Sequence, residues 1–275
     1  MINHITIWIF YIIIIYFLNK KILSKNFLRS NTGSKHQLFA NESIPLTGGI
    51  FILFPILLIY LPNNFLICLF FILIFLTGLL SDLNFLISPK KRFFLQLFFI
   101  SVFIFYTKLE VLPTKIDFID NLIDNTFFSY ALTIFCLMIL INGSNFIDGL
   151  NGLFLGYIII IFLILLKTNL FYSLGFSVEQ FSFLIMAFIF ILILNYSNQL
   201  FMGDSGAYAL SFLIGLSLIY IYNFTPNLSP FFIILLLWYP CFENLFSIIR
   251  KFTFRKSPLK PDNKHLHQYL FQFFI

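Results

Sequence analysis

The feature that most constrains this chain is a series of nine apolar runs, most of which approach or exceed the roughly 17 residues that a helix needs to cross a bilayer. The runs cover about residues 3–18, 49–61, 65–80, 93–107, 126–142, 152–167, 180–195, 206–223 and 231–248. Only 10% of the residues are charged, whereas a soluble domain carries about 25%. A soluble fold is therefore excluded. We expect an all-α, polytopic integral membrane protein, a single domain of residues 1–275 with about nine and at most ten transmembrane helices.

The basic residues indicate which side of the membrane each loop faces. With the N-terminus outside, the cytoplasmic segments are 19–48, 81–92, 143–151, 196–205 and 249–275. These segments hold 14 of the 17 Lys and Arg residues, so topology explains the net charge of +6 and nucleic acid binding is not needed. The first run has no small-residue cleavage site, which predicts an anchor and not a removed signal peptide. Most polar, Gly-rich and His-containing clusters share these segments, so we expect one site on the cytoplasmic face.

The five segments combine carboxylates with His and basic side chains. Their carboxylates are Glu42, Asp82, Asp148, Asp204 and Asp262. This mixture suits Mg²⁺ and phosphates, because Mg²⁺ is usually held by one or two carboxylates together with substrate phosphate oxygens. Asp204 begins a predicted helix, so it either binds such a metal or only caps the helix. Asp148 and Asn151 either belong to the site or serve as turn residues, and Asn145 beside them favours the site.

Two further acidic residues lie where a carboxylate is unfavourable. Asp82 closes a predicted helix, at the negative end of its dipole, so a cation has to compensate. The candidates are a bound metal, Lys90, Lys91 and Arg92, with a plain surface ion pair as the alternative. Glu243 lies inside an apolar run, where a charged side chain is energetically costly and is usually kept for a function. The alternative is a structural ion pair with Arg250, which lies two turns further on.

Taken in order, the polar segments resemble the polyprenyl-phosphate N-acetylhexosamine-1-phosphate transferase family, which includes the phospho-N-acetylmuramoyl-pentapeptide transferases. The resemblance runs from about Lys35 to His267. Its strongest pieces are FMGDSG at 201–206, NFIDGLNGL at 145–153, HLH at 265–267 and IPLTGGI at 44–50. The short HLH form and IPLTGG resemble the hexosamine branch more than the muramoyl-pentapeptide branch.

The resemblance implies a reaction in which a polyprenyl phosphate, such as undecaprenyl phosphate, attacks a UDP-N-acetyl sugar and releases UMP. It implies Mg²⁺ as cofactor, with Mn²⁺ able to replace it, and Asp204 as the metal ligand. The implied catalytic residues are Asp82, Asp148, His265 and His267. The implied substrate-binding residues are Lys35, Arg92, Asn145, Asn151, Asn195 and Phe201, of which Phe201 would stack on uracil. Such an enzyme begins a cell-surface polysaccharide, such as the O-antigen of lipopolysaccharide, at the inner (plasma) membrane, as a monomer or a homodimer.

The chain departs from the family pattern at three positions. The adjacent Asp pair is Ser81-Asp82 here, the second Asp of the DGxDG motif is Asn151, and the third His of the cluster is Gln268. These departures leave open a catalytically silent relative that binds the lipid carrier or partner enzymes. A transporter is a further alternative, but the sequence has no matching pair of broken segments in two halves.

Overall fold

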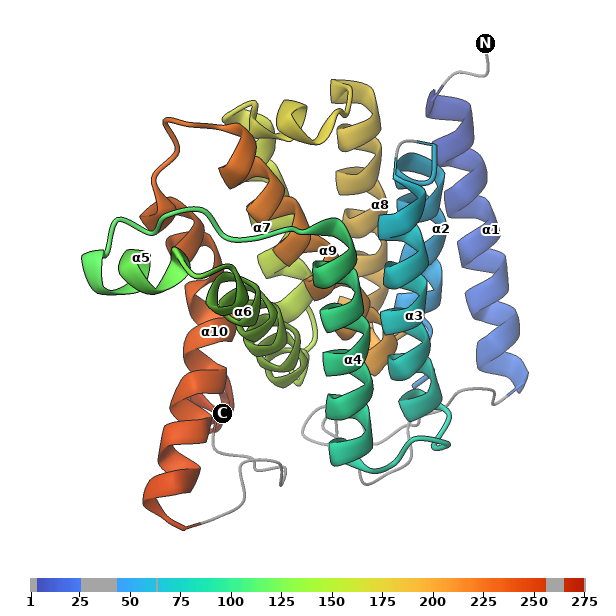
Figure 1. Ribbon diagram of the computed structural model, residues 1–275. Helices are drawn as coiled ribbons and strands as arrows, with labels where there is room; N and C mark the ends of the chain where they lie inside the picture. The colour runs from blue at the N-terminus through green and yellow to red at the C-terminus, as the bar shows by residue number, and fades with distance from the viewer. Residues whose placement is uncertain (1–3, 26–43, 63, 256–264, 275) are drawn as a thin grey trace.

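The computed structural model describes residues 4–25, 44–62, 64–255 and 265–274, and within these ranges the chain folds as a bundle of helices (Figure 1). In chain order the elements are α1 (His4–Lys25), α2 (Gly48–Tyr60), α3 (Phe65–Asp82), α4 (Pro89–Thr107), α5 (Asp117–Ile123), α6 (Thr126–Ile147), α7 (Leu153–Lys167), the 3₁₀ helix η1 (Leu170–Leu174), α8 (Val178–Tyr196), α9 (Gly203–Phe224), α10 (Pro230–Thr253) and α11 (Leu266–Phe274). The prediction of an all-α fold is confirmed.

Each of the nine apolar runs corresponds to one helix, with ends shifted by a few residues. Among the described residues, five helices are long and apolar enough to cross a membrane, namely α3, α6, α8, α9 and α10. Helices α2 and α7 are apolar but have only 13 and 15 residues. The count of nine or ten spans and the side that each loop faces stay predictions. The sequence analysis did not predict α5, η1 and α11, because each is shorter than ten residues and lacks a long apolar run.

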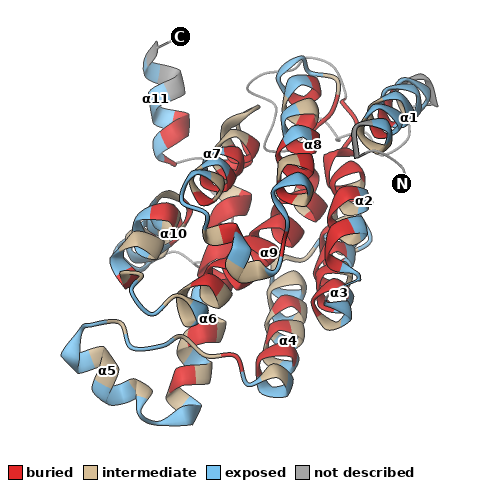
Figure 2. Cartoon of the chain, turned by 90° about the horizontal axis from the view of Figure 1, so that it is seen from above, coloured by how far each residue is buried: buried red, intermediate tan, exposed pale blue. Residues whose placement is uncertain are grey.

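Helix α9 is the centre of the bundle. It packs against α2, α3, α6, α10 and η1, and Figure 2 shows it surrounded and mostly buried. Of the 18 residues that form its candidate membrane-spanning stretch, 72% are buried, whereas only 28% are buried in the corresponding stretch of the peripheral α10. Small residues allow this central position, because helices in a membrane pack most closely where side chains are small. A Cβ atom on Gly78 of α3, for example, would lie 2.4 Å from Cα of Ser205, so the two backbones are in direct contact.

Helix α10 is attached to the bundle near its middle. Pro240 has no N–H group, so the carbonyl of Leu236 one turn earlier lacks its helical donor. The hydroxyl of Tyr157 on α7 donates to that carbonyl at 2.5 Å. Asn244 donates to the carbonyl of Ile139 on α6 at 2.8 Å. These two bonds hold the neighbouring Glu243 on the side of α10 that faces the bundle, where it is buried.

Candidate active site

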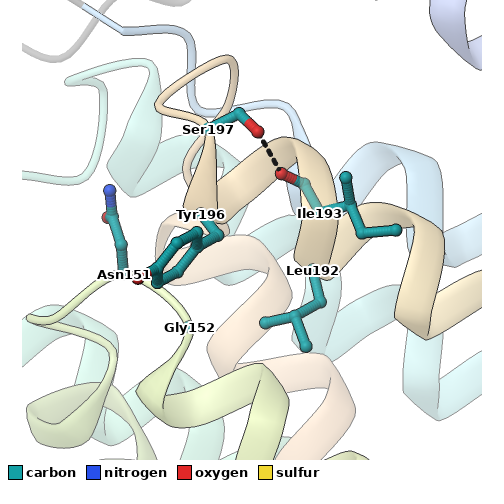
Figure 3. Close-up of a pocket in the computed structure, with 6 residues that line it drawn as sticks. All are labelled: Asn151, Gly152, Leu192, Ile193, Tyr196 and Ser197. Atoms are coloured by element: carbon teal, nitrogen blue, oxygen red, sulfur yellow. Dashed lines mark hydrogen bonds between the residues drawn. The ribbon is translucent and has the colours of Figure 1, made fainter.

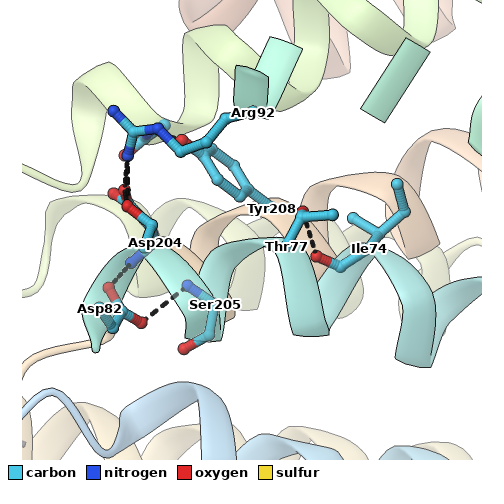
Figure 4. A network of polar contacts seen from close by, with 9 residues as sticks. Ile74, Thr77, Asp82, Arg92, Asp204, Ser205 and Tyr208 are labelled. Atoms are coloured by element: carbon cyan, nitrogen blue, oxygen red, sulfur yellow. Dashed lines mark hydrogen bonds and ion pairs between the residues drawn. The ribbon is translucent and has the colours of Figure 1, made fainter. Parts of the chain in front are cut away.

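The start of α9 is held by a carboxylate from another helix. Asp82, the last residue of α3, accepts hydrogen bonds from the backbone N–H groups of Asp204 at 2.8 Å and Ser205 at 3.0 Å (Figure 4). Gly203 makes this approach feasible, because its φ is +74° and a Cβ there would lie 2.6 Å from Oδ2 of Asp82. The positive end of α9 therefore compensates Asp82 at the end of α3. Of the basic side chains that we considered for this role, Arg92 pairs with Asp204 instead, and Lys90 and Lys91 are exposed. A metal beside Asp82 stays a prediction.

The Asp204 side chain is consequently available for other partners. Its Oδ2 accepts a hydrogen bond from the hydroxyl of Ser81 at 2.7 Å and forms an ion pair with Nη1 of Arg92. Nη1 of Arg92 also donates to the Ser81 hydroxyl. The side chains of Arg92 and Asp204 are 17% and 13% exposed, so this cluster reaches the surface while Asp82 lies behind it. Asp204 is thus not the cap of its own helix, which was the alternative interpretation.

The end of α6 reaches the same cluster through Tyr208, which lies one turn after Asp204 on α9. The amide of Asn145 donates to the Tyr208 hydroxyl at 2.7 Å, and Figure 4 shows the guanidinium of Arg92 beside the Tyr208 ring. Asp148 follows the last residue of α6 and is buried. The structure therefore brings Asp82, Arg92, Asp204 and Asn145 together, as the sequence predicted for one site. Tyr208 was missed, although its i+4 spacing from Asp204 places both residues on one helix face.

A second polar cluster forms where α10 and α11 meet the end of α6. The ring of His265 stacks on Phe146, with centroids 4.6 Å apart, and its Nδ1 lies 2.9 Å from Oε2 of Glu243. Nδ1 of His267 lies 3.2 Å from the Tyr239 hydroxyl. Nε2 of His267 is buried without a hydrogen-bond partner among the described residues.

That nitrogen of His267 points at the turn after Asp148, since a Cβ on Gly149 would lie 3.6 Å from it. Burial lowers the pKa of His267 to about 4, and the neighbouring His265 adds to the effect, so the His267 ring is neutral near pH 7. The partner of Glu243 is His265 and not Arg250, which the sequence had offered as the alternative. His265 thus contacts the end of α6, and His267 faces the turn that follows it.

A pocket of about 410 Å³ lies between the start of α7 and the end of α8 (Figure 3). Its lining residues are Asn151, Gly152, Leu192, Ile193, Tyr196 and Ser197. Asn195 forms the base of this wall: its oxygen accepts from the N–H of Gly152 at 2.7 Å, and its amide donates to the carbonyl of Leu200 at 3.0 Å. Because both ends of the amide have partners and the side chain is buried, Asn195 supports the wall of this pocket and does not line it.

Phe201 and Lys35 were also predicted to contact the substrate, and the structure describes only Phe201. The ring of Phe201 is 1% exposed and packs with Ile44 and Leu46, so in this conformation it offers no open face to a uracil base. Its burial follows from the segment before α2, where the carbonyl of Pro45 accepts from the Phe201 N–H at 2.9 Å. Lys35 lies outside the described residues.

The donor set fits a Mg²⁺ ion that shares its ligands with a diphosphate. Among the residues that the structure describes, no three His, Cys, Asp or Glu side chains gather as a protein-only metal site. Mg²⁺ needs only one or two carboxylates when phosphate oxygens and water complete its shell, and Asp204 supplies one near the surface. Nε of Arg92 and both amide atoms of Gln96, one turn further along α4, are buried and have no hydrogen-bond partner in the part of the chain that the structure describes. Such orphaned groups at a site are accounted for by a polar ligand or by water.

The fold and these clusters define a class: a polytopic membrane protein whose acidic, basic and imidazole groups gather at helix ends, as an anionic ligand requires. The sequence model of glycosyl transferase family 4 matches residues 64–222, more than half of the chain. The chain therefore belongs to this family. The matched region includes both Asp82 and Asp204, and the HLH motif lies beyond it.

Three relatives have names that describe the same kind of chemistry. A probable undecaprenyl-phosphate N-acetylglucosaminyl 1-phosphate transferase of Bacillus subtilis is 30% identical over 207 residues, 73% of this chain and 56% of that protein. An undecaprenyl-phosphate alpha-N-acetylglucosaminyl 1-phosphate transferase of Thermotoga maritima is 30% identical over 82% of this chain and 67% of its own length. A phospho-N-acetylmuramoyl-pentapeptide-transferase of Dictyoglomus thermophilum is 31% identical over 79% and 73%. The match thus spans little more than half of the Bacillus protein.

Proposed function

We propose that this protein transfers an N-acetylhexosamine 1-phosphate from a UDP-sugar to a polyprenyl phosphate and releases UMP. The observation that carries the proposal is the Asp204 carboxylate, which pairs with Arg92 at the surface end of α9 while Asp82 binds the N–H groups of that helix start. A lipid acceptor and a water-soluble nucleotide can meet only where helix ends reach the membrane surface. The names of the Bacillus and Thermotoga relatives support the same acceptor and the same kind of transferred group.

The residues of the chain have separable tasks in this reaction. Arg92 binds a phosphate oxygen through its guanidinium, which matches phosphate geometry. Asp148 follows α6, whose end contacts the HLH motif at His265, and His265 approaches the diphosphate from the side of α11. A Mg²⁺ ion held by Asp204 would supply positive charge to the diphosphate. Asn151 and Asn195 shape the nucleotide pocket, while Asn145 holds Tyr208, which lies one turn after Asp204 on α9.

Direct attack by the lipid phosphate is the mechanism that we favour. A phosphate monoester has its second pKa near 6, so it is largely dianionic at neutral pH and needs little help from a base. Both oxygens of Asp82 accept backbone N–H bonds, which makes this carboxylate a poor nucleophile. Ser81 cannot replace a carboxylate, and its hydroxyl donates to Asp204.

The finer assignments belong to the same proposal. We place the site on the cytoplasmic face of the plasma membrane, because basic residues dominate the loops on that side. The product would begin a cell-surface polysaccharide such as an O-antigen, with an N-acetylhexosamine as the first sugar. A homodimer is compatible with this function but is not needed for it, since all the groups above come from one chain.

The test supplies purified protein with polyprenyl phosphate, Mg²⁺ and a panel of UDP-N-acetylhexosamines, and it measures UMP. We expect release with at least one donor, and a loss of several orders of magnitude for Asp204→Asn, because a neutral amide is a poor Mg²⁺ ligand. Asp124→Asn is the matched control, since it makes the same change at an exposed position after α5. Folded protein that releases no UMP with any donor would favour the silent relative or the transporter, and near-normal turnover of Asp204→Asn would refute the metal assignment.

A further inference from the structure

Glu243 is an ionisable residue that the proposed reaction leaves without a task. It lies within α10, a helix long and apolar enough to cross a membrane, and it is 3% exposed. Burying a charged group in such a helix is costly unless the group is paired. The contacts of its two carboxylate oxygens therefore indicate what the residue does.

The two oxygens of Glu243 bind two parts of the HLH segment. Oε2 lies 2.9 Å from Nδ1 of His265, and Oε1 accepts a hydrogen bond from the backbone N–H of Leu266 at 2.8 Å. Leu266 is the first residue of α11, so this bond satisfies one of the N–H groups that a helix start leaves unpaired. One buried carboxylate thus fixes both the start of α11 and the imidazole next to it.

This contact determines the hydrogen position on the His265 ring. A carboxylate only accepts hydrogen bonds, so Nδ1 must carry the hydrogen that lies between the two groups. Phe146 stacks against the ring and fixes its plane. The opposite nitrogen, Nε2, is then held in one direction and one state, which is how a carboxylate behind an imidazole acts in other enzymes.

The second imidazole of the motif has a different partner. His267 faces the neutral hydroxyl of Tyr239. An imidazole that donates to an anion takes on positive charge, and a carboxylate on its other nitrogen stabilises that charge. A neutral hydroxyl stabilises it less. The two His residues are therefore not equivalent, and His265 is the one suited to a diphosphate.

We propose that Glu243 is a positioning residue, which holds His265 in one tautomer and one orientation towards the diphosphate while it fixes the start of α11. This inference rests on the proposed transferase function. It adds Glu243, which lies beyond the residues that match the family model, to the machinery of the site.

The variant Glu243→Gln separates the two contacts. Its carbonyl oxygen can still accept from the Leu266 N–H, so α11 stays in place, but its NH₂ group then faces Nδ1 of His265. We expect kcat/KM for UMP release to fall about 10- to 100-fold, the range found when the partner of a metal-bound imidazole is removed, with a melting temperature close to that of the unmodified protein. Glu179→Gln is the matched control, because Glu179 is exposed in the first turn of α8.

A double-mutant cycle shows whether Glu243 acts through His265. In a His265→Ala background, Glu243→Gln should cause less than about a twofold further loss, because residues that act as a unit are not additive. An undiminished further loss would mean that Glu243 only supports the fold, and it would overturn the proposal. A Glu243→Gln variant with unchanged kcat/KM would do the same.

A measurement without turnover keeps this test separate from the test of the proposed function. In ¹⁵N-histidine NMR, the His265 signal, identified by its loss in His265→Ala, should show a protonated Nδ1 in the unmodified protein. In Glu243→Gln the hydrogen should move to Nε2. A His265 ring with an unprotonated Nδ1 in the unmodified protein would overturn the positioning role whether or not UMP is released.

Discussion

Replacing Asp82 with Asn tests whether this carboxylate holds the start of α9. Hydrogen bonds to charged groups contribute about 1.5–3 kcal/mol each, and a buried donor left unpaired costs about 1–3 kcal/mol. Asn has one acceptor oxygen, so it can serve either the N–H of Asp204 or that of Ser205 and must turn its NH₂ group towards the other. The favourable interaction between the charge and the positive end of α9 is also lost, at up to about 2 kcal/mol.

Two effects oppose this loss, because Asn is cheaper to bury than a carboxylate and does not repel Asp204. Repulsion from Asp204 is a substantial part of this cost, although the pairing of Asp204 with Arg92 reduces it. We therefore expect a net destabilisation of about 2–4 kcal/mol, less than the sum of the individual losses. The hydrogen bond from the Asp204 N–H to Asp82 also positions the Asp204 side chain. UMP release should therefore fall as well.

The assay is reversible unfolding in mixed detergent micelles, followed by circular dichroism as the denaturing detergent is titrated. Ser81→Ala is the matched control, because Ser81 contacts the Asp204 side chain but neither backbone N–H group. It should lose at most about 1.5 kcal/mol, the value of an ordinary hydrogen bond. An Asp82→Asn variant within about 0.5 kcal/mol of the unmodified protein, the usual effect of a surface substitution, would refute the capping role.

Three further predictions concern the mechanism, the HLH motif and the topology. Ser81→Ala should keep at least about a tenth of the rate of UMP release, because direct attack needs no nucleophile there, and its complete inactivation would favour a covalent intermediate. The folded pKa of His267, about 4, lies below the usual value of about 6.5, so docking of α11 is strongest above pH 6.5 and weakens as the pH falls towards 4. The midpoint of detergent-induced unfolding should fall over that interval, and it should fall less in His267→Gln. Single Cys residues in the polar segments should all resist an impermeant thiol reagent on intact cells, and labelling of only some would break the single-site argument. The positions are Asn84, Asn198 and Asn263, with Leu150 for the loop after α6, because Ser144 in that region is buried.

The sequence predicted the helices because apolar runs are local, and a run of bilayer length has few alternatives to a helix. It also predicted which segments share the site, since topology puts alternate loops on one side. Individual partners were harder to predict. Asp82 was assigned a cation, but its partners are the N–H groups of residues 204 and 205, more than 120 positions away. For Glu243 the sequence suggested Arg250, which shares its helix, whereas its partner His265 lies just before the start of α11.

Phe201 illustrates the same limit. Its place in FMGDSG suggested an exposed aromatic ring, but Ile44 and Leu46 cover it. That cover depends on how the segment before α2 pairs with the backbone at 201–202, through bonds such as Gly48 N–H to Phe201 carbonyl at 2.9 Å. Periodicity and composition carry no information about such pairings, because they depend on where two distant segments meet.

The central position of α9 has a consequence for how the protein is made. Helices α2, α3 and α6 are synthesised before α9, yet all three pack against it. The direct backbone contacts of Gly49 and Gly78 with residues 205 and 206 cannot form until the ribosome has passed this point. The earlier helices must therefore stay loosely associated in the bilayer, and they pack fully only when α9 is inserted between them. Asp82 receives its two N–H partners only at that late step, so a nascent chain that stops before Gly203 contains most of the membrane helices and no assembled site.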